Sequence, residues 1–266
     1  MRFPMRSLAA LLVAAAPAAA DDLTIVAKGT SGGGQPTTTT SYIASDHARI
    51  DQGDGREMIA DLKGGVFTMI DGKKKQYFVV TRQDLEQLKA QMQQQMNNPE
   101  VQKAQEQMKN LPPEVQKRMQ AAMGSMVGAV TVQKKGSTRK VAGYNCEDWT
   151  VAIGTMSKTE ECLSTELPLP AQSWAAYKDF AESMTGAMTA MGPMGKGFAE
   201  LREKMKDLKG YPLSRTTTSS VLGRTTTSTT EVTEVKKGAI PASAWEVPAG
   251  YTKVDNPMLK GMAPSK

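Results

Sequence analysis

Histidine, cysteine and aromatic residues are scarce in this chain of 266 residues, which has one histidine, two cysteines and 5% aromatic residues. A serine hydrolase would have to use His47, yet no Gly-x-Ser-x-Gly motif accompanies it. The segment Ser45–Arg49 around His47 is typical of a turn or a strand end. Zinc would lack its usual nitrogen and thiolate ligands, and basic residues are not interleaved with aromatic ones as in nucleic-acid-binding proteins. We therefore expect no catalytic activity, no metal site and no cofactor.

Long hydrophobic runs are also missing, because nothing after residue 20 approaches the roughly 20 apolar residues of a transmembrane helix. The marked apolar run lies at the N-terminus, between the basic residues Arg2 and Arg6 and the small residues Ala18–Ala20. This pattern is typical of a secretory signal peptide over residues 1–20. We predict cleavage after Ala20 and a soluble periplasmic protein. The new N-terminus would be Asp21, which, unlike cysteine, offers no site for a lipid anchor.

Turn-forming dipeptides divide the first part of the chain into short β-prone runs. They are Asp54-Gly55, Gly64-Gly65 and Asp71-Gly72. The basic run Lys73–Lys75 is expected at an exposed hairpin tip, with contact to anionic lipid head groups as the weaker alternative. The predicted strands of this antiparallel meander cover residues 23–28, 37–44, 57–62, 66–70 and 76–81.

The hydrophobic period then changes to that of a helix. Leu85, Leu88, Met92 and Met96 share one helical stripe, and further amphipathic stretches cover residues 101–111 and 115–126. We expect residues 82–126 to form a helical insertion. Another helix is predicted from the spacing of Trp174 to Met191, with a continuation over residues 198–208.

Strand signals return at residues 129–135 and 149–153, and a long hairpin is predicted from 211–221 and 224–236. Residues 244–247 are expected to form a short closing segment of β-structure. Because strands come from both ends of the chain and helices are inserted twice, we predict a single α+β domain over residues 21–266.

The two cysteines are positioned to pair. If residues 157–164 return antiparallel to residues 144–153, the midpoint between Cys146 and Cys162 is Gly154, a residue suited to a turn. The two thiols would then face each other across neighbouring strands. A structural disulfide is expected in an exported protein. The spacing differs from the Cys-x-x-Cys of redox-active pairs, which is the weaker alternative.

Two compositional biases concern adaptable or weakly apolar surfaces. The 18 methionines include Met188, Met191 and Met194, and also Met123 and Met126. These thioethers suit Cu(I), but the same helical spacing suits flexible packing between helix and sheet, or an adaptable surface for lipid tails or variable clients. Threonine-rich runs at 37–40, 216–218 and 225–230 indicate either a solvated outer sheet or the amphiphilic wall of an open cavity.

Three segments resemble an uncharacterised exported bacterial family that is described only as a domain of unknown function. They are Ile70–Tyr77 (IDGKKKQY), Val141–Trp149 (VAGYNCEDW) and Val247–Tyr251 (VPAGY). The family is similar in layout to the outer-membrane lipoprotein carriers (LolA-like proteins). This resemblance implies a curved antiparallel sheet, an open half-barrel, with helices packed on its concave face around a hydrophobic cavity for acyl chains. It identifies no binding residue in this chain.

We therefore expect a periplasmic binding or carrier protein for a lipid, an acyl chain or another amphiphile. Its partners would be lipid or acylated protein and envelope proteins. The alternatives are a methionine-rich protein that binds copper or buffers oxidation, and a structural envelope module without a small ligand. The residues expected to line the hydrophobic site are Trp174, Phe180, Met184, Met188 and Met191.

Overall fold

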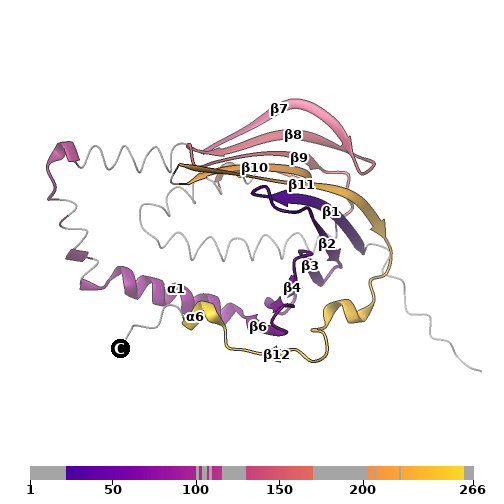
Figure 1. Cartoon of the computed structure of the whole chain (residues 1–266), viewed down its shortest axis with the longest axis horizontal. Coiled ribbons are helices and arrows are strands. Elements are labelled where there is room, and N and C mark those ends of the chain that lie inside the picture. The colour runs from indigo at the N-terminus through magenta and orange to yellow at the C-terminus, as the bar shows by residue number, and fades with distance from the viewer. Residues whose placement is uncertain are drawn as a thin grey trace, which may run out of the picture.

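The computed structural model describes residues 22–99, 102–103, 107, 110–115, 130–169, 203–205, 208–221 and 223–260. In these residues, twelve strands form one open sheet in the order β12-β6-β5-β4-β3-β2-β1-β11-β10-β9-β8-β7. The strands are β1 (Leu23–Ser31), β2 (Thr37–Ile43), β3 (His47–Asp51), β4 (Arg56–Asp61), β5 (Val66–Asp71), β6 (Gln76–Val80), β7 (Val130–Val141), β8 (Tyr144–Ile153), β9 (Ser157–Ser164), β10 (Tyr211–Val221), β11 (Arg224–Lys237) and β12 (Thr252–Lys253). Figure 1 shows the sheet curving from β7 at the top, past β1, to β6 and β12 at the bottom.

Strands from both ends of the chain meet in this sheet, as the sequence predicts, because β1 lies between β2 and β11. All neighbours are antiparallel except β12, which pairs parallel with β6. The sheet is therefore mixed rather than purely antiparallel. The basic run Lys73–Lys75 occupies the turn between β5 and β6, as expected for a hairpin tip.

Two segments differ from the prediction. Residues 47–51, for which no strand was predicted, form β3, which pairs with both β2 and β4, and His47 is its first residue, in agreement with the expected strand end. This strand has only two apolar residues on one face, Ala48 and Ile50, so its alternation is too short to stand out from the polar turns beside it. The closing segment expected as β-structure at 244–247 begins in a 3-10 helix, η1 (Ala242–Trp245).

Helix α1 (Arg82–Met96) follows β6 directly and agrees with the predicted helical stripe. A capping box defines its start, because the Asp84 N–H donates to Thr81 Oγ1 at 3.1 Å and the Thr81 N–H donates to an Asp84 carboxylate oxygen at 2.7 Å. Leu85 is 6% exposed and packs with Ala60, Phe67 and Val80. Most of the other predicted helical residues, including 116–126 and 174–191, lie outside the described residues.

Cys146 and Cys162 form the expected disulfide, with a Cα–Cα distance of 5.3 Å. The predicted register was wrong, however. Cys162 stands directly opposite Asp148, and the turn covers residues 154–156. The centre of the β8–β9 hairpin is therefore Thr155 and not Gly154. The two cysteines are diagonal neighbours on one face of the sheet, still within the range that a disulfide spans.

The C-terminal segment after β11 crosses the sheet and ties its strands together. Arg49 of β3 donates from Nη1 to the carbonyl oxygen of Ala244 at 2.8 Å. The ring of Trp245 stacks on His47 with 5.4 Å between ring centroids. The segment then pairs with β6 through β12 and ends in the short helix α6 (Pro257–Lys260), which contacts α1.

Candidate functional site

The face of the sheet on which Leu85 packs is called the inner face. Strand register places two rows of directly paired residues on this face, across all of β1 to β6. The first row is Leu23, Ile43, Ala48, Ala60, Phe67 and Val80, and the second row is Ile25, Ser41, Ile50, Met58, Met69 and Phe78. All but Ser41 are apolar. The inner face of this half of the sheet is therefore a continuous hydrophobic wall.

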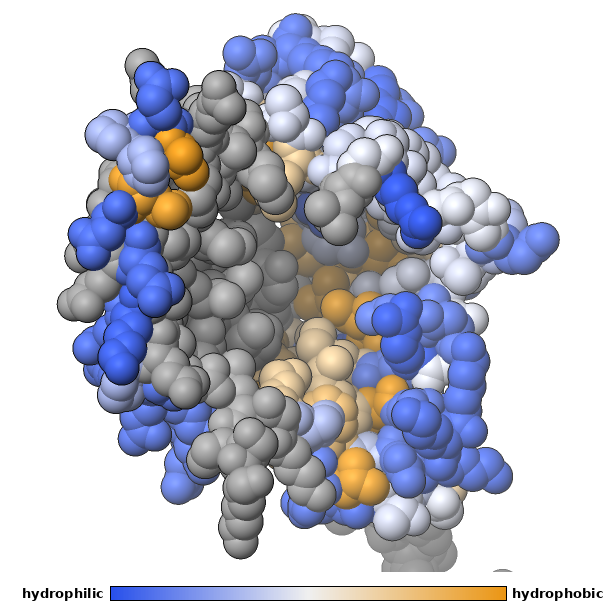
Figure 2. Space-filling model, turned by 60° about the vertical axis from the view of Figure 1, so that its left-hand side comes forward, coloured by the Kyte–Doolittle hydropathy of each residue, from blue (hydrophilic) through white to orange (hydrophobic). Residues whose placement is uncertain are grey.

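Over β4–β6 the two rows differ in how exposed their side chains are. Ala60, Phe67 and Val80 of the first row are at most 6% exposed, and Leu85 covers them. In the second row, Met58, Met69 and Phe78 are only partly buried. We call Ile50, Met58, Met69 and Phe78 the half-buried row. Figure 2 shows a hollow in the molecule with hydrophobic residues on its floor and hydrophilic residues at its rims.

A pocket of about 630 Å³ opens beside the edge strand β7. Val130, Val132 and Trp149 provide its apolar side, and Thr131, Gln133, Glu203 and Lys204 provide its polar side. The Lys204 ammonium donates to the carbonyl oxygen of Val130. The ammonium of Lys134 lies 5.9 Å from the centroid of the Trp149 ring, in a cation–π arrangement. A volume of this order suits a small ligand or one part of a larger one.

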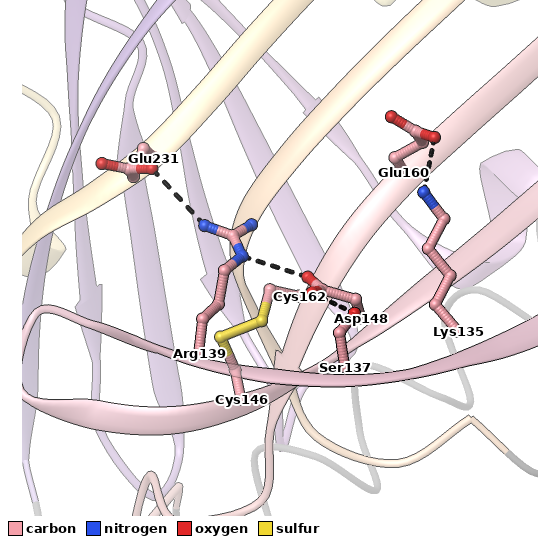
Figure 3. A network of polar contacts seen from close by, with 8 residues as sticks. All are labelled: Lys135, Ser137, Arg139, Cys146, Asp148, Glu160, Cys162 and Glu231. Atoms are coloured by element: carbon pink, nitrogen blue, oxygen red, sulfur yellow. Dashed lines mark hydrogen bonds and ion pairs between the residues drawn. A yellow bond between two sulfur atoms is a disulfide. The ribbon is translucent and has the colours of Figure 1, made fainter.

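The opposite face of β7 to β11 carries ion pairs instead of a pocket (Figure 3). Arg139 Nε lies 3.0 Å from an Asp148 carboxylate oxygen, and Arg139 Nη1 lies 3.8 Å from Glu231 of β11. Lys135 Nζ lies 2.7 Å from Glu160. Hydrogen bonds from Lys135 and Lys158 lower the pKa of Glu160 to about 2. Register puts Arg139 opposite Cys146 and Asp148 opposite Cys162, so the ion pair and the disulfide share this face.

This outer network is suited to holding strands together and not to acid–base chemistry. A general acid or base works best with a pKa near the working pH. Desolvation raises the pKa of Asp148, but hydrogen bonds from Ser137 and Arg139 together outweigh it, so this pKa also lies below its usual value. No group of three or more His, Cys, Asp or Glu side chains in the described part of the chain is placed to hold a metal ion.

The threonine-rich runs, distant in sequence, meet on four adjacent strands. β10, β11, β1 and β2 lie side by side, and register pairs Thr218 with Thr227 and Thr30 with Thr229. The hydroxyls of Thr30 and Thr229 are 3.0 Å apart. Most of the threonines in β11 are exposed. The solvated-sheet interpretation therefore fits β11, whereas the hydrophobic wall lies on β1–β6.

The residues predicted to line the hydrophobic site, Trp174, Phe180, Met184, Met188 and Met191, lie outside the described residues. So do Met123, Met126 and Met194 of the copper hypothesis, and both interpretations stay predictions. The half-buried row was not predicted from the sequence, although each of its strands was predicted except β3. The signal for this row was the alternation of apolar and polar residues in each short strand. These apolar residues form a wall only when the strands are aligned.

None of the helices in the described ranges is both long and apolar enough to cross a bilayer.

Three solved structures illustrate what the chain is similar to. PNGF-II matches with 11% identity and a TM-score of 0.40 over 91% of this chain and 32% of that chain, so the chain spans about a third of the length of PNGF-II. A chain of the Pseudomonas aeruginosa MucA/MucB complex matches with 13% identity and a TM-score of 0.39, over 86% of this chain and 56% of that chain. A LolA superfamily protein from Nitrosomonas europaea matches with 7% identity and a TM-score of 0.24, over 85% of this chain and 90% of that chain.

A comparison with curated protein sequences finds no match. A family model does match, over residues 80–251, and its description is a domain of unknown function, DUF4412. The match covers more than half of the chain, from the end of β6 to the segment before β12. It includes two of the three segments on which the sequence resemblance rests. The chain therefore belongs to the DUF4412 family.

Proposed function

We propose that this protein is a periplasmic binding or carrier protein, without catalytic activity, for a lipid, an acyl chain or another amphiphile. The observation that carries the proposal is the half-buried row: Ile50, Met58, Met69 and Phe78 are directly paired across four strands and are only partly covered. An acyl chain on this row would remove apolar surface from water on both partners, at about 25 cal/mol per Å².

Methionine suits such a site because its unbranched thioether side chain adapts to differently shaped apolar partners. Met58 and Met69 stand directly opposite each other at the centre of the row. A carrier needs this adaptability, since it must accept chains of different length and release them. Partner molecules would therefore be lipids or acylated proteins delivered by the cell envelope.

The proposed location rests on two features of the chain. The N-terminal pattern over residues 1–20 is typical of a signal peptide, and Cys146 and Cys162 form a disulfide. Disulfides persist in the periplasm and are rare in the cytosol, where thiols are kept reduced.

The test is a titration of the protein with a fluorescent fatty acid, compared between two single substitutions on adjacent residues of β5. Met69→Lys places a charge in the half-buried row, whereas Thr68→Lys places the same charge on the opposite face of the same strand. Met69→Lys should abolish saturable binding, because an ammonium on the apolar wall is unfavourable for a hydrocarbon chain. Thr68→Lys should bind like the unmodified protein.

Urea unfolding of both variants checks that they are folded before binding is compared. Equal affinities for the fatty acid in folded Met69→Lys and in the unmodified protein would contradict the proposed site. Absence of saturable binding in the unmodified protein would contradict the proposed function itself.

A further inference from the structure

A row of polar residues crosses the sheet from β7 to β11. Direct register pairs join Lys134 to Trp149, Trp149 to Glu161, Glu161 to Arg215 and Arg215 to Thr230. Thr230 is in turn opposite Gly29 of β1, whose neighbours Lys28 and Thr30 point to the other face. Directly paired residues share a face, so these five side chains lie in line on one face of the C-terminal half of the sheet.

Arg215 and Lys134 are the two cations of this row, and both are paired with an acid and about half exposed, but the acid that pairs with Arg215 is buried. Nε and Nη2 of Arg215 lie 3.0 and 2.9 Å from the same Glu161 oxygen, Oε2. The Glu161 side chain is 5% exposed, whereas that of Arg215 is 50% exposed. An incoming ligand would therefore meet the guanidinium and not the carboxylate beneath it. Nη1 of Arg215 takes no part in the pair with Glu161.

Arg215 also lies at a boundary in polarity. A shift of two positions along β9, β10 and β11 in one direction leads from this row to Leu163, Leu213 and Val232, which are apolar and at most 6% exposed. In the other direction are the hydroxyl residues Thr159, Thr217 and Ser228, and the hydroxyls of Thr159 and Thr217 are 3.2 Å apart. Hydroxyls can donate to an acceptor that Arg215 holds.

The apolar side of the pocket beside β7 begins two strands away. Trp149, which lines that pocket with Val130 and Val132, is directly opposite Glu161. With neighbouring strands about 4.8 Å apart, Trp149 and Arg215 are separated by roughly 10 Å along the sheet. An amphiphile with one end at Arg215 therefore has an apolar surface within reach of its chain.

We propose that Arg215, assisted by the hydroxyls of Thr217 and Thr230, binds an oxyanion, a carboxylate or a phosphate, at the head of an amphiphile. Arg215 lies on β10, between Trp149 of β8 and the half-buried row of β3–β6 in the strand order. This inference rests on the proposed function and names the class of ligand. A guanidinium offers several N–H donors in a plane that matches a carboxylate or phosphate, and such charge-assisted hydrogen bonds are about twice as strong as neutral ones. Register places Glu161 and Glu147 on this face, and both are already paired, Glu161 with Arg215 and Glu147 with Lys134 at 2.8 Å.

Three ligands with saturated hydrocarbon chains of nearly the same length test the proposal on the full-length protein: palmitate, hexadecyl phosphate and hexadecanol. Replacing Arg215 alone would leave the buried Glu161 carboxylate without a partner, which destabilises proteins. The informative variant is therefore the double substitution Arg215→Gln/Glu161→Gln, which removes both charges together. Arg56→Gln, at an exposed arginine that pairs with Asp54 in a turn, is the matched control.

Isothermal titration calorimetry measures the dissociation constants of the anionic ligands that bind. In the double variant these constants should rise about tenfold, which is the loss of affinity expected for one charge-assisted interaction. The constant for hexadecanol should stay within about twofold. Arg215→Lys, which keeps the charge but not the planar fork, should recover part of the loss. Comparing palmitate with hexadecyl phosphate distinguishes a carboxylate ligand from a phosphate ligand.

Other outcomes overturn the proposal. An equal loss for hexadecanol would mean that the row only supports the fold, and unchanged binding of both anions would place the head group elsewhere. In both cases the unmodified protein still binds amphiphiles, so the proposed function stands. If the unmodified protein binds none of the three ligands, the proposed function and this inference fail together.

Discussion

The two halves of the sheet are held together in different ways. Strands β3–β6 are five or six residues long, and they are joined by tight turns and covered by Leu85 of α1. Strands β7, β10 and β11 have 11 to 14 residues. These strands share a core cluster with β1 near Leu213 and Val232. Beyond this cluster their side chains are mainly hydroxyl residues and ion-paired residues.

This contrast shows where apolar surface is available for a ligand. In β1–β6 the inner face carries two apolar rows, and one helix covers mainly the first of them. In β7–β11 the strands are joined through their side chains, by a disulfide, ion pairs and threonine contacts, and apolar residues are grouped in the core cluster near Leu213 and Val232 and in the pocket beside Trp149. A hydrophobic ligand is therefore expected to use the first half as its wall and the second half for its polar end.

The largest expected effect is in the first half, at Phe67. Its side chain is 6% exposed and lies between Ala60, Val80 and Leu85. Phe67→Ala should reduce the free energy of unfolding by about 3–5 kcal/mol through lost burial and the cavity left behind. Urea unfolding measures this loss. Phe78→Ala, at the half-buried row, is the control and should cost clearly less; an equal cost would mean that the row is packed as tightly as the core.

Removal of the disulfide should have the next largest effect, and it should be confined to the second half. Cys146 and Cys162 are 16 residues apart in sequence, and a loop of this length corresponds to about 3 kcal/mol in the chain-entropy model. The double substitution Cys146→Ala/Cys162→Ala should lower the free energy of unfolding by about that amount. Hydrogen exchange should increase in β8 and β9 while β4–β6 stay protected. Uniform loss of protection would show that the two halves unfold as one unit.

A small effect is expected at Glu160, whose pKa is lowered from 4.5 to about 2 by hydrogen bonds from Lys135 and Lys158. Because the pKa is lower in the folded state, the contribution of Glu160 to stability is complete above pH 4.5 and disappears as the pH falls through 2. The carboxylate is 42% exposed, so solvent screening reduces the contribution to under about 1 kcal/mol.

Glu160→Gln should therefore lower the free energy of unfolding slightly at pH 7, and this difference should shrink to nothing as the pH falls through 2. The difference between variant and unmodified protein, measured by denaturant unfolding across this range, is the readout. A difference that grows as the pH falls would contradict the pKa shift.

Much of the strand order within each half follows from local sequence, whereas the site depends on the register between neighbouring strands. The Gly-containing dipeptides at 54–55, 64–65 and 71–72 locate the turns of the meander because glycine tolerates the backbone conformations that tight turns require. The register of the β8–β9 hairpin was misjudged by assuming that Gly154 is its midpoint, since a glycine marks a turn without specifying its centre.

The wall itself could not be derived from local pattern. Each strand from β3 to β6 contributes only two residues to the apolar rows, and Met58 meets Met69 only through the register of β4 and β5. Likewise Arg215 and Glu161 are 54 positions apart in sequence, and only the pairing of β9 with β10 brings them together. Contacts of this kind depend on tertiary structure, which sequence periodicity does not report.

Native mass spectrometry of the protein purified from its own cells, followed by lipid extraction, tests amphiphile binding most directly. We expect a population heavier than the polypeptide, which loses a lipid or acylated peptide on denaturation. A mass equal to that of the polypeptide alone, unchanged after incubation with envelope lipids, would contradict a carrier function and favour an envelope module without a small ligand.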